Sequence, residues 1–429
     1  MTALPTPTVR RTVIVTDYLP TEVDRQVHGV YQRQRRHVQA LQSLGPVDMI
    51  FLWPRGFGSR GPEIERGLDL LRRRWDLAGR LEILESRFTG QADLLRLLLP
   101  AAFPGLFAGT STAQDADTSR AIRALLSEIK PDLVFAFRIG AALPVLRAGS
   151  NAPVMVDFDD IEHLRLRRDA RLASGVETIR LRAASALMCR LEGYVARRAA
   201  LCLVASAGDE KYLVSRFPQA RVSVLSNAAF SAGVQPPSAE PTALLVGMAR
   251  YRPNAEGAVW LARKVWPLVK LALPAARLLV AGEGSEELGI ADADRGIETL
   301  GFVPNLLPLY RNARIALCPV RTGGGTRIKI IEAAMAGRAC VATAIGAEGL
   351  AFDDRRHIRI ADRPEDFAAA CIELLGNSSL ARSLGEAAAN VAGRLYSETS
   401  QISGLVEMAR RVIAGDAAVG RIRPAGSLS

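Results

Sequence analysis

The sequence predicts an α/β protein made of two doubly wound units, each built around a parallel sheet. Short apolar runs alternate with longer segments of helical periodicity along most of the 429 residues. A stretch rich in proline, glycine and small polar residues, 231–241, divides this alternation into two. In the second half, a glycine-rich turn separates an apolar run from a helical pattern. Because open parallel sheets bind ligands at the carboxyl ends of their strands, we expect the ligand between the two units.

The first domain is predicted to span residues 1–230, ahead of a linker at 231–242. A stretch at 94–107 is apolar and broken by proline, which fits either a buried helix and loop or a contact with a membrane interface. A long arginine-rich helical region is expected over 163–200. The remaining elements expected here are a helix at 30–44 and strands at 12–16, 47–52, 81–84, 132–137, 154–157, 201–205 and 222–225.

The second domain is predicted to span residues 243–395, and Asn254 and Thr326 are expected to cap two of its helices. A last helical segment covers about 396–414, and the tail at 415–429 has the glycine, alanine and arginine content of a disordered segment. The strands expected are 243–247, 277–281, 314–317, 341–343 and 358–360, and the helices are 255–271, 301–311 with its loop, 326–336, 364–375, 378–395 and 399–414.

Composition and charge limit the classes of function that this protein can have. The formal net charge is +11 and is carried mostly by arginine, which favours anionic partners such as nucleotides or phospholipid headgroups. No zinc-finger, helix-turn-helix or aromatic-basic motif is found, so we do not expect nucleic-acid binding. No secretory signal pattern and no apolar run of membrane-spanning length occurs, so a cytoplasmic protein is expected. Five scattered cysteines fit reduced core thiols and give no metal-binding spacing: Cys189, Cys202, Cys318, Cys340 and Cys371.

The chemistry is concentrated in the segment from Gly323 to Gly337. Its three consecutive glycines, Gly323, Gly324 and Gly325, let the backbone turn sharply and approach a ligand. A helix follows, so free amides and the helix dipole favour an anion, and Arg327 and Lys329 add full positive charges. Further along the helix, the carboxylate of Glu332 suits a pair of ribose hydroxyls. The segment therefore indicates a nucleotide-diphosphate site, with a glycine-rich loop before a solvated charged helix as the plainer alternative.

This segment resembles the donor-binding region of family 4 glycosyltransferases, which are retaining enzymes of the GT-B fold. The match is to the branch with the Gly-Gly-Gly-Thr-Arg-x-Lys-x-x-Glu motif, and it covers 323–333, 341–343 and 346–350. Glu332 corresponds to the second Glu of the wider family's Glu-x7-Glu pair, whereas Gly324 stands where the first Glu would be. The resemblance implies two Rossmann-like domains facing a central cleft, with the last helix crossing back to the first domain. It also implies front-face transfer without a metal ion or a cofactor.

Other parts of the second domain resemble the same branch. The segment from Gly247 to Asn254 matches Gly-x-Met-x-Tyr-x-Pro-Asn, but Met248 and Pro253 replace the Arg and Lys that grip the diphosphate in the wider family. Arg250 or Arg252 would substitute for that pair, unless both are solvated surface arginines. The resemblance also assigns a loop near the nucleotide base at Gly282 and base-reading backbone groups at Phe302 and Val303.

Acceptor candidates come from the first domain. The run from Asp157 to His163 follows a strand, and the resemblance implies that Asp159 or His163 contacts the sugar or the acceptor. We take His163 as a catalytic candidate, with an acidic cluster favoured by a helix dipole as the alternative. His28 and Gly29 fall where the family has a glycine loop facing the acceptor, although the usual Gly-Gly pair is absent.

The sequence thus predicts a metal-independent glycosyltransferase that moves a sugar from a nucleotide-diphosphate sugar to an acceptor hydroxyl in glycan or glycolipid synthesis. A nucleotide-sugar epimerase of the same fold and a non-catalytic nucleotide-sugar-binding protein are the alternatives. The acceptor is expected to be a glycan or a lipid-linked molecule. Six arginines of the helical region suggest peripheral contact with an anionic membrane, on the inner face of the cytoplasmic membrane, with a solvated helix face as the alternative: Arg165, Arg167, Arg168, Arg171, Arg180 and Arg182.

Overall fold

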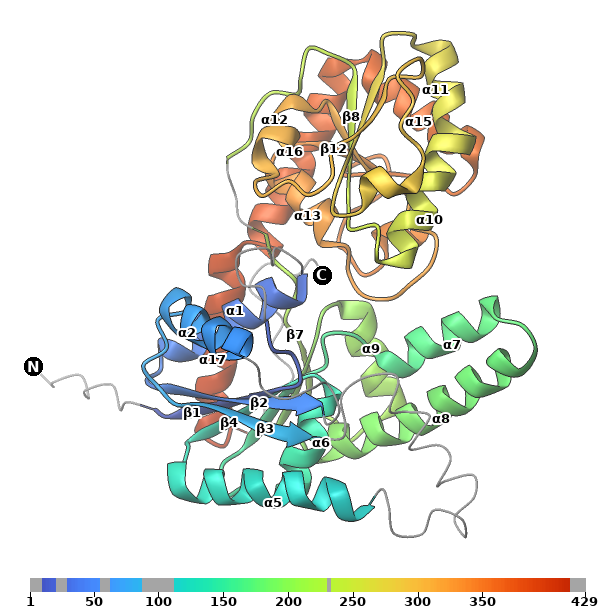
Figure 1. The fold of residues 1–429 in the computed structure, drawn as a ribbon. Helices are drawn as coiled ribbons and strands as arrows, with labels where there is room; N and C mark the ends of the chain where they lie inside the picture. The colour runs from blue at the N-terminus through green and yellow to red at the C-terminus, as the bar shows by residue number, and fades with distance from the viewer. Residues whose placement is uncertain (1–9, 21–28, 55–61, 87–111, 230–232, 417–429) are drawn as a thin grey trace, which may run out of the picture. The chain divides into compact units, whose positions relative to one another are not determined.

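The computed structural model describes residues 10–20, 29–54, 62–86, 112–229 and 233–416. The chain divides into two compact units (Figure 1). One unit comprises residues 1–225 and 402–429, and the other comprises 226–401, so residues 226–229 join the second unit. The predicted apolar stretch at 94–107 and the predicted tail beyond 416 lie outside the described residues.

The first unit contains a parallel sheet of seven strands in the order β3-β2-β1-β4-β5-β6-β7. From β1 the chain adds β2 and β3 on one side and then β4 to β7 on the other, so β1 and β4 lie side by side where the order of the strands reverses. This is the kind of switch point at which open α/β sheets bind ligands. The strands are β1 (Thr12–Thr16), β2 (Val47–Pro54), β3 (Leu81–Ser86), β4 (Leu133–Phe137), β5 (Val154–Asp157), β6 (Leu201–Val204) and β7 (Val222–Val224).

The strands β1, β4 and β6 bury apolar side chains on both faces, so helices must cover the sheet on both sides. Ile14 packs into one core, whereas its neighbours Val13 and Val15 pack into another on the opposite face. The first core includes residues of α1, α2 and α17, and the second includes residues of α5, α6, α8 and α9. The helices are α1 (Gly29–Gln42), α2 (Pro62–Arg74), α5 (Thr112–Ile129), α6 (Ile139–Ala148), α7 (Glu162–Leu172), α8 (Gly175–Arg198), α9 (Ala207–Arg216) and α17 (Glu398–Ile413).

The second unit contains a parallel sheet of six strands in the order β10-β9-β8-β11-β12-β13, with its switch point between β8 and β11. Buried residues form one core around α10, α11 and α15 and another around α12, α13 and α16. The elements are β8 (Thr242–Val246), α10 (Arg252–Trp260), α11 (Trp266–Ala272), β9 (Arg277–Ala281), β10 (Ile297–Thr299), α12 (Leu307–Asn312), β11 (Ile315–Cys318), α13 (Ile328–Met335), β12 (Ala339–Ala342), α14 (Ala344–Ala347), β13 (Arg359–Ile360), α15 (Pro364–Gly376) and α16 (Ser378–Leu395).

The prediction of one helix at 255–271 was wrong in two respects. The helix begins earlier, at Arg252, because Pro253 fits the first turn of a helix, where no backbone donor is needed. It is also interrupted by a π-helical turn, Leu261–Val265, directly before α11. Pro267 lies at the start of α11, and a proline cannot continue the preceding hydrogen-bond ladder. In the second unit β10 and α14 were not predicted, and in the first unit neither were the helices α2, α5, α6 and α9.

Two buried arginines hold the segment before β8 against the second unit. The guanidinium of Arg338, which is 0% exposed, donates to the carbonyls of Gln235, Pro236 and Ala313. Arg314 likewise donates to the carbonyls of Ser238 and Ala239. Burial lowers the pKa of Arg338 to about 10. The described part of the predicted linker is therefore fixed to this unit by cation-to-carbonyl hydrogen bonds.

Candidate nucleotide-sugar site

The ligand of a doubly wound sheet is expected at its switch point, and two glycine-containing loops of the second unit lie there. One loop follows β8 and leads into α10, and the other follows β11 and leads into α13. A third loop begins at Gly282, directly after β9. A Cβ atom on Gly282 would lie 2.1 Å from the carbonyl oxygen of Gly247, so these two loops touch through their backbones. The β8 loop is therefore bordered by loops from both neighbouring strands.

The glycine loop after β11 has the left-handed backbone that its sequence predicts. Gly323 has a φ of 96° and Gly325 a φ of 73°, values that L side chains rarely adopt. A Cβ on Gly323 would also lie 2.7 Å from the hydroxyl of Tyr251, which belongs to the β8 loop. Glycine is thus required at Gly323 for both its conformation and its close approach to the neighbouring loop.

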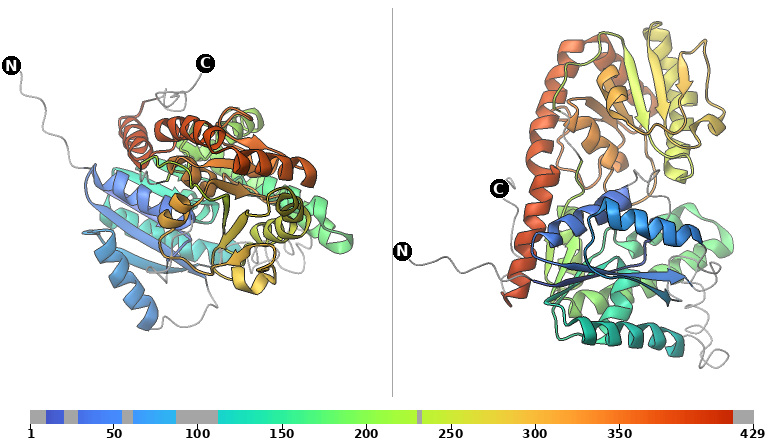
Figure 2. Two further views of the ribbon diagram at one scale, coloured as in Figure 1. Left: turned by 90° about the horizontal axis from the view of Figure 1, so that it is seen from above. Right: turned by 60° about the vertical axis from the view of Figure 1, so that its left-hand side comes forward.

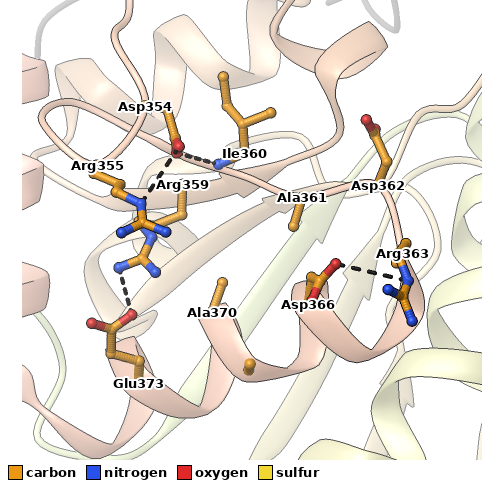
Figure 3. A pocket seen from close by; sticks show the side chains of 11 residues that line it. Asp354, Arg355, Arg359, Ile360, Ala361, Asp362, Arg363, Asp366, Ala370 and Glu373 are labelled. Atoms are coloured by element: carbon orange, nitrogen blue, oxygen red, sulfur yellow. Dashed lines mark hydrogen bonds and ion pairs between the residues drawn. The ribbon is translucent and has the colours of Figure 1, made fainter.

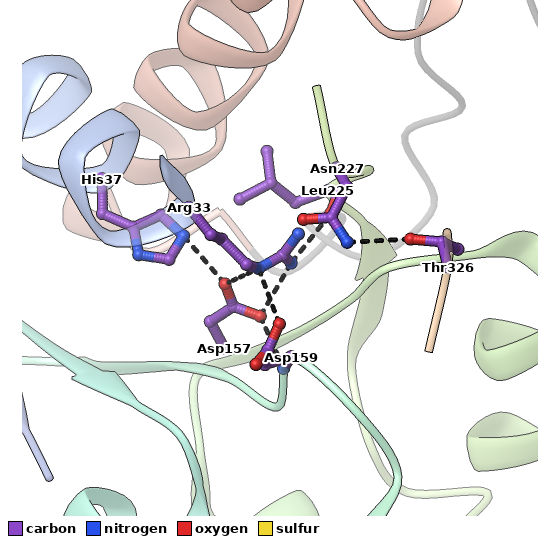
Figure 4. A network of polar contacts seen from close by, with 7 residues as sticks. All are labelled: Arg33, His37, Asp157, Asp159, Leu225, Asn227 and Thr326. Atoms are coloured by element: carbon purple, nitrogen blue, oxygen red, sulfur yellow. Dashed lines mark hydrogen bonds and ion pairs between the residues drawn. The ribbon is translucent and has the colours of Figure 1, made fainter. Parts of the chain in front are cut away.

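Thr326 does not cap α13, which corrects the predicted helix start. The helix begins at Ile328, and Arg327 occupies the N-cap position without a side-chain cap hydrogen bond. The hydroxyl of Thr326 instead accepts a hydrogen bond of 2.8 Å from Asn227 Nδ2 (Figure 4). Thr326 therefore ties the glycine loop to the segment that opens the second unit.

Arg327 organises the glycine loop from within. Its Nη1 donates to the carbonyls of Gly324 and Gly325, and its Nη2 lies 3.4 Å from the carbonyl of Thr322. The side chain is 7% exposed, and Nε has no hydrogen-bond partner among the described residues. Arg327, which was predicted to bind phosphate, thus points toward the loop carbonyls in this structure. There its charge fixes the loop and makes the potential of the loop more positive.

Lys329 lies beside the β8 loop, so the two switch-point loops meet at its ammonium group. Its Nζ donates to Asn254 Oδ1 at 2.8 Å, while Asn254 Nδ2 donates to the carbonyl of Met248 at 3.1 Å. A Cβ on Gly247 would lie 2.7 Å from Lys329 Nζ, so the ammonium occupies the space beside a glycine. Asn254 is therefore a positioning residue inside α10 and not the helix cap that its sequence suggested.

Burial lowers the pKa of Lys329, and the nearby Arg327 lowers it further. A part-buried ammonium beside a guanidinium gains from an anionic partner, because the partner offsets both the lost hydration and the repulsion between the two cations. The pair is thus suited to a ligand that carries phosphate groups.

Glu332 follows Lys329 by one helical turn on α13. Its Oε2 accepts a hydrogen bond of 3.2 Å from the hydroxyl of Tyr310 on α12. Burial raises the pKa of Glu332, and burial together with the adjacent carboxylate raises the pKa of Tyr310. Tyr310 had no motif in the sequence to reveal it, because the contact depends on how α12 packs against α13.

Arg250 and Arg252 are both exposed and paired with nearby carboxylates. Arg250 forms an ion pair with Glu283, which belongs to the loop after β9. Arg252 pairs with Glu256 at 2.6 Å, one turn further along α10. The carboxylates that pair with these two arginines are not the partners of Lys329, so the arginines form a charged group separate from the Lys329 site.

The predicted base-reading segment lies after β10. Phe302 is 40% exposed, whereas Val303 packs against the core around α12 and α13. The preceding Gly301 has a φ of 62° and donates its backbone amide to Ser285 Oγ at 3.0 Å. Gly282 donates its own amide to the carbonyl of Gly301 at 2.7 Å, so the two predicted backbone sites adjoin each other.

In the first unit, Asp157 ends β5 at the centre of a buried ionic network (Figure 4). Arg33 donates to both of its carboxylate oxygens, at 2.7 and 2.9 Å, and His37 Nε2 lies 2.8 Å from Oδ2. Burial alone would raise the pKa of Asp157, but the Arg33 guanidinium holds it well below the usual range. Burial lowers the pKa of His37, which keeps the imidazole neutral. Asp157 therefore has a structural partner set that sequence analysis missed.

Asp159 lies next to this network. It adopts a φ of 60°, which is unusual for a residue with a side chain, and its carboxylate lies 3.7 Å from Arg33 Nε. Burial raises the pKa of Asp159, and burial with the neighbouring Asp159 and Glu162 carboxylates raises the pKa of Asp160 to about 7. The strained turn thus holds several carboxylates together at the carboxyl edge of β5.

A second strained residue faces this turn from β4. Arg138 has a φ of 73°, and its Nη1 lies 3.7 Å from Asp17 Oδ1, directly after β1. Both residues follow the strands that flank the switch point, and burial raises the pKa of Asp17. The sequence analysis did not name either residue. Each directly follows a predicted strand, and that position could have marked both as candidate site residues.

His163 is buried, with both ring nitrogens in contact with polar atoms. Its Nδ1 pairs with the carboxylate of Glu192, and its Nε2 lies 2.6 Å from the hydroxyl of Tyr212. Glu192 is 0% exposed and also accepts from the backbone amide of Glu162 at 2.8 Å. These contacts connect α7, α8 and α9, so they give His163 a structural role in holding three helices together.

Three remaining expectations concern the acceptor loop, metal binding and membrane-spanning helices. Gly29 is the first residue of α1, whereas His28 lies outside the described residues. Among the residues that the structure describes, no cluster of three or more His, Cys, Asp or Glu side chains could hold a metal ion. In the same residues, no helix combines the length and apolar character needed to cross a membrane.

A cavity of about 520 Å³ lies elsewhere in the second unit, between β13 and α15 (Figure 3). Its charged side chains neutralise one another: Arg359 pairs with Glu373 at 2.5 Å, and Arg363 lies 3.9 Å from Asp366. This hollow shares no lining residue with the glycine loop, so it is not part of the candidate site.

Comparison with solved structures identifies the fold as GT-B. Sucrose-phosphate synthase from Thermosynechococcus elongatus is 14% identical, with a TM-score of 0.64 over 95% of this chain and 100% of that chain. TarM of S. aureus is 10% identical, with a TM-score of 0.66 over 95% and 99%. Anabaena HepE, solved with UDP and glucose, is 12% identical, with a TM-score of 0.59 over 93% and 98%.

The sequence comparison points to the same class of protein. Residues 240–377 match the family model described as "Glycosyl transferases group 1". This range contains every predicted donor-site residue, from Arg250 to Glu332. No curated protein matches the chain at a significant level. The family match and the fold together support a glycosyltransferase.

Proposed function

We propose that this protein is a retaining glycosyltransferase that takes its sugar from a nucleotide-diphosphate sugar bound to the second unit. The observation that carries the proposal is the meeting of the two switch-point loops at Lys329. The ammonium of Lys329, the glycine loop around Arg327 and the carboxylate of Glu332 all lie on one continuous segment. The match of this region to group 1 glycosyl transferases supports the same site.

Each residue has a separate role in this proposal. Lys329 binds the diphosphate, because its part-buried ammonium lies beside Arg327 and gains from an anionic partner. Arg327 fixes the glycine loop, whose backbone and positive potential stabilise the negative charge that develops on the leaving phosphate. Glu332 accepts hydrogen bonds from ribose hydroxyls while Tyr310 fixes its orientation.

The acceptor hydroxyl is proposed to attack from the face that the nucleotide leaves, with a donor phosphate oxygen taking its proton. Such a step needs no carboxylate nucleophile, in keeping with the absence of the family's first Glu at Gly324. In the first unit, Asp159 and Gly29 remain our candidates for acceptor contact. Because His163 is held by Glu192 and Tyr212, we assign it no proton-transfer step.

The test is a panel of UDP-, GDP- and ADP-sugars, each incubated with the protein with and without simple glycoside or lipid-linked acceptors. Release of nucleoside diphosphate together with an α-configured product from an α-configured donor is the expected result. A new epimer of the donor formed without an acceptor would assign the protein to the epimerase class. Binding without release or transfer under any condition would leave a nucleotide-sugar-binding protein.

A further inference from the structure

Helices α7 and α8 form a hairpin that extends away from the sheet of the first unit (Figures 1 and 2). The turn is short, and Gly175 adopts a left-handed φ of 58° to begin α8. Near the sheet, the two helices share a small apolar core of Leu166, Ala184 and Met188. This buried core does not include the residues around the turn.

Among the described residues of this unit, the far end carries the most exposed group of large apolar side chains. Leu172 is 67% exposed, Val176 81% and Ile179 69%. In the described residues, Leu271 of the second unit is the one other large apolar side chain that is more than 60% exposed. Val176 and Ile179 are three residues apart and therefore share a helix face. We call Leu172, Val176 and Ile179 the apolar tip.

Arginines flank the apolar tip on both helices. Residues 164–183 contain six arginines and two acidic residues, Asp169 and Glu177. Arg180 pairs with Glu177 at 2.7 Å, and Arg165 pairs with Asp169 at 2.8 Å. With six arginines against two carboxylates, residues 164–183 carry a formal net charge of +4; the remaining arginines are Arg167, Arg168, Arg171 and Arg182.

We propose that the end of the α7–α8 hairpin is a docking surface for anionic phospholipid membranes. The apolar tip would enter the boundary between headgroups and acyl chains, while the long arginine side chains reach outward to lipid phosphates. A protein partner is less suited to this surface, because a stable protein interface needs about 800 Å² on each side, far more than three side chains at a helical turn provide. The proposal does not depend on the transferase activity.

The experiment is co-sedimentation of the full-length protein with vesicles of phosphatidylcholine alone or with about 30% phosphatidylglycerol. We expect binding to the anionic vesicles at low salt and a strong decrease toward 1 M salt, where the screening length falls to about 3 Å. The variant Leu172→Ser/Val176→Ser/Ile179→Ser should bind roughly a hundredfold more weakly, since three apolar side chains would no longer enter the membrane. These residues are exposed, so the fold should be retained, as circular dichroism would show.

Charge is tested separately with matched pairs of exposed arginines. Arg167→Gln/Arg171→Gln on the hairpin should weaken binding roughly 30-fold, from about a 5-fold contribution of each cation near the membrane surface. Arg72→Gln/Arg73→Gln on α2 removes the same charge from another exposed face of the same unit and should change binding less than about 3-fold. For the apolar tip, the control variant is Leu268→Ser/Leu271→Ser, which removes exposed apolar side chains from α11 of the second unit.

Three outcomes would overturn the proposal. One is no sedimentation with anionic vesicles at low salt. Another is equal loss of binding in the hairpin and control variants, which would mean that net charge alone drives association. The third is self-association without lipid that disappears in the tip variant, which analytical ultracentrifugation would detect and which would make the tip a contact between copies of this chain.

Discussion

Replacing Glu332 by Gln separates the role of this residue in nucleotide binding from its role in stability. The amide keeps the size of the side chain and still offers an oxygen to the Tyr310 hydroxyl, 3.2 Å away in the wild type. It removes the negative charge and one of the two acceptor oxygens. If these accept ribose hydroxyls, the loss is that of a hydrogen bond to a charged group, about 1.5–3 kcal/mol. Affinity for the nucleoside diphosphate should therefore fall on the order of ten- to a hundredfold.

Stability should move the other way. Because burial raises the pKa of Glu332 in the folded protein, the charged form is disfavoured there relative to the unfolded chain. Wild-type stability is therefore reduced as the pH rises from about 4.3, the ordinary glutamate value, through the raised pKa. The glutamine side chain of Glu332→Gln cannot ionise, so the melting temperature of the variant should equal or exceed that of the wild type at neutral pH. The difference should disappear in acid.

Calorimetry with UDP, GDP and ADP measures the affinities, and scanning calorimetry from about pH 4 to 8 measures the stabilities on both sides of the ordinary glutamate pKa. Tyr310→Phe is the matched control, because it removes the hydroxyl next to Glu332 but leaves the carboxylate in place. It should weaken nucleotide binding less than Glu332→Gln does. Wild-type nucleotide affinity in Glu332→Gln would refute the donor site, whereas weak binding accompanied by a lower melting temperature would mean that the substitution damages the fold.

Four further results are expected. Gly247→Ala should lower nucleotide affinity as Lys329→Ala does, with the fold retained, because its Cβ would displace an ammonium 2.7 Å away; normal affinity in calorimetry would contradict this. Arg327→Ala should lower kcat more than donor affinity in steady-state kinetics, since it loosens the loop that stabilises the leaving group. Arg338→Ala should lower the free energy of unfolding by roughly 3 kcal/mol or more in urea titrations, because buried carbonyls lose their donor at about 1–3 kcal/mol each. Sugar transfer should survive EDTA; loss of activity that manganese restores would refute the metal-independent mechanism.

Much of the fold was accessible from local sequence. The first strand was predicted at its observed limits, Thr12–Thr16, and α16 at 378–395, because strong apolar patterns and clear ends coincide there. The glycine loop was also predictable, since left-handed φ angles at Gly323 and Gly325 follow from residue type and context. These features depend on neighbours in the chain, and such neighbours are visible in a sequence.

The partners of the site residues were decided by tertiary structure. Thr326 looked like a helix cap, yet its hydroxyl pairs with Asn227, which lies 99 residues away in the sequence. Asn254 looked like another cap, yet it joins Lys329 to the β8 loop. In each case a short polar side chain had a local hydrogen bond available, and packing of distant loops offered a different one. Which of the two hydrogen bonds forms, the local cap or the contact with a distant loop, cannot be predicted from the neighbouring residues in the sequence.

The same reason accounts for the first unit. That acidic residues follow β5 could be predicted from the sequence, because strand and charge patterns depend on neighbouring residues. The pairing of Asp157 with Arg33 on α1 and of His163 with Glu192 depends on how the chain folds. A buried charge must find a partner wherever the fold brings one within reach, and that partner is set by the packing of helices on the sheet rather than by distance along the chain.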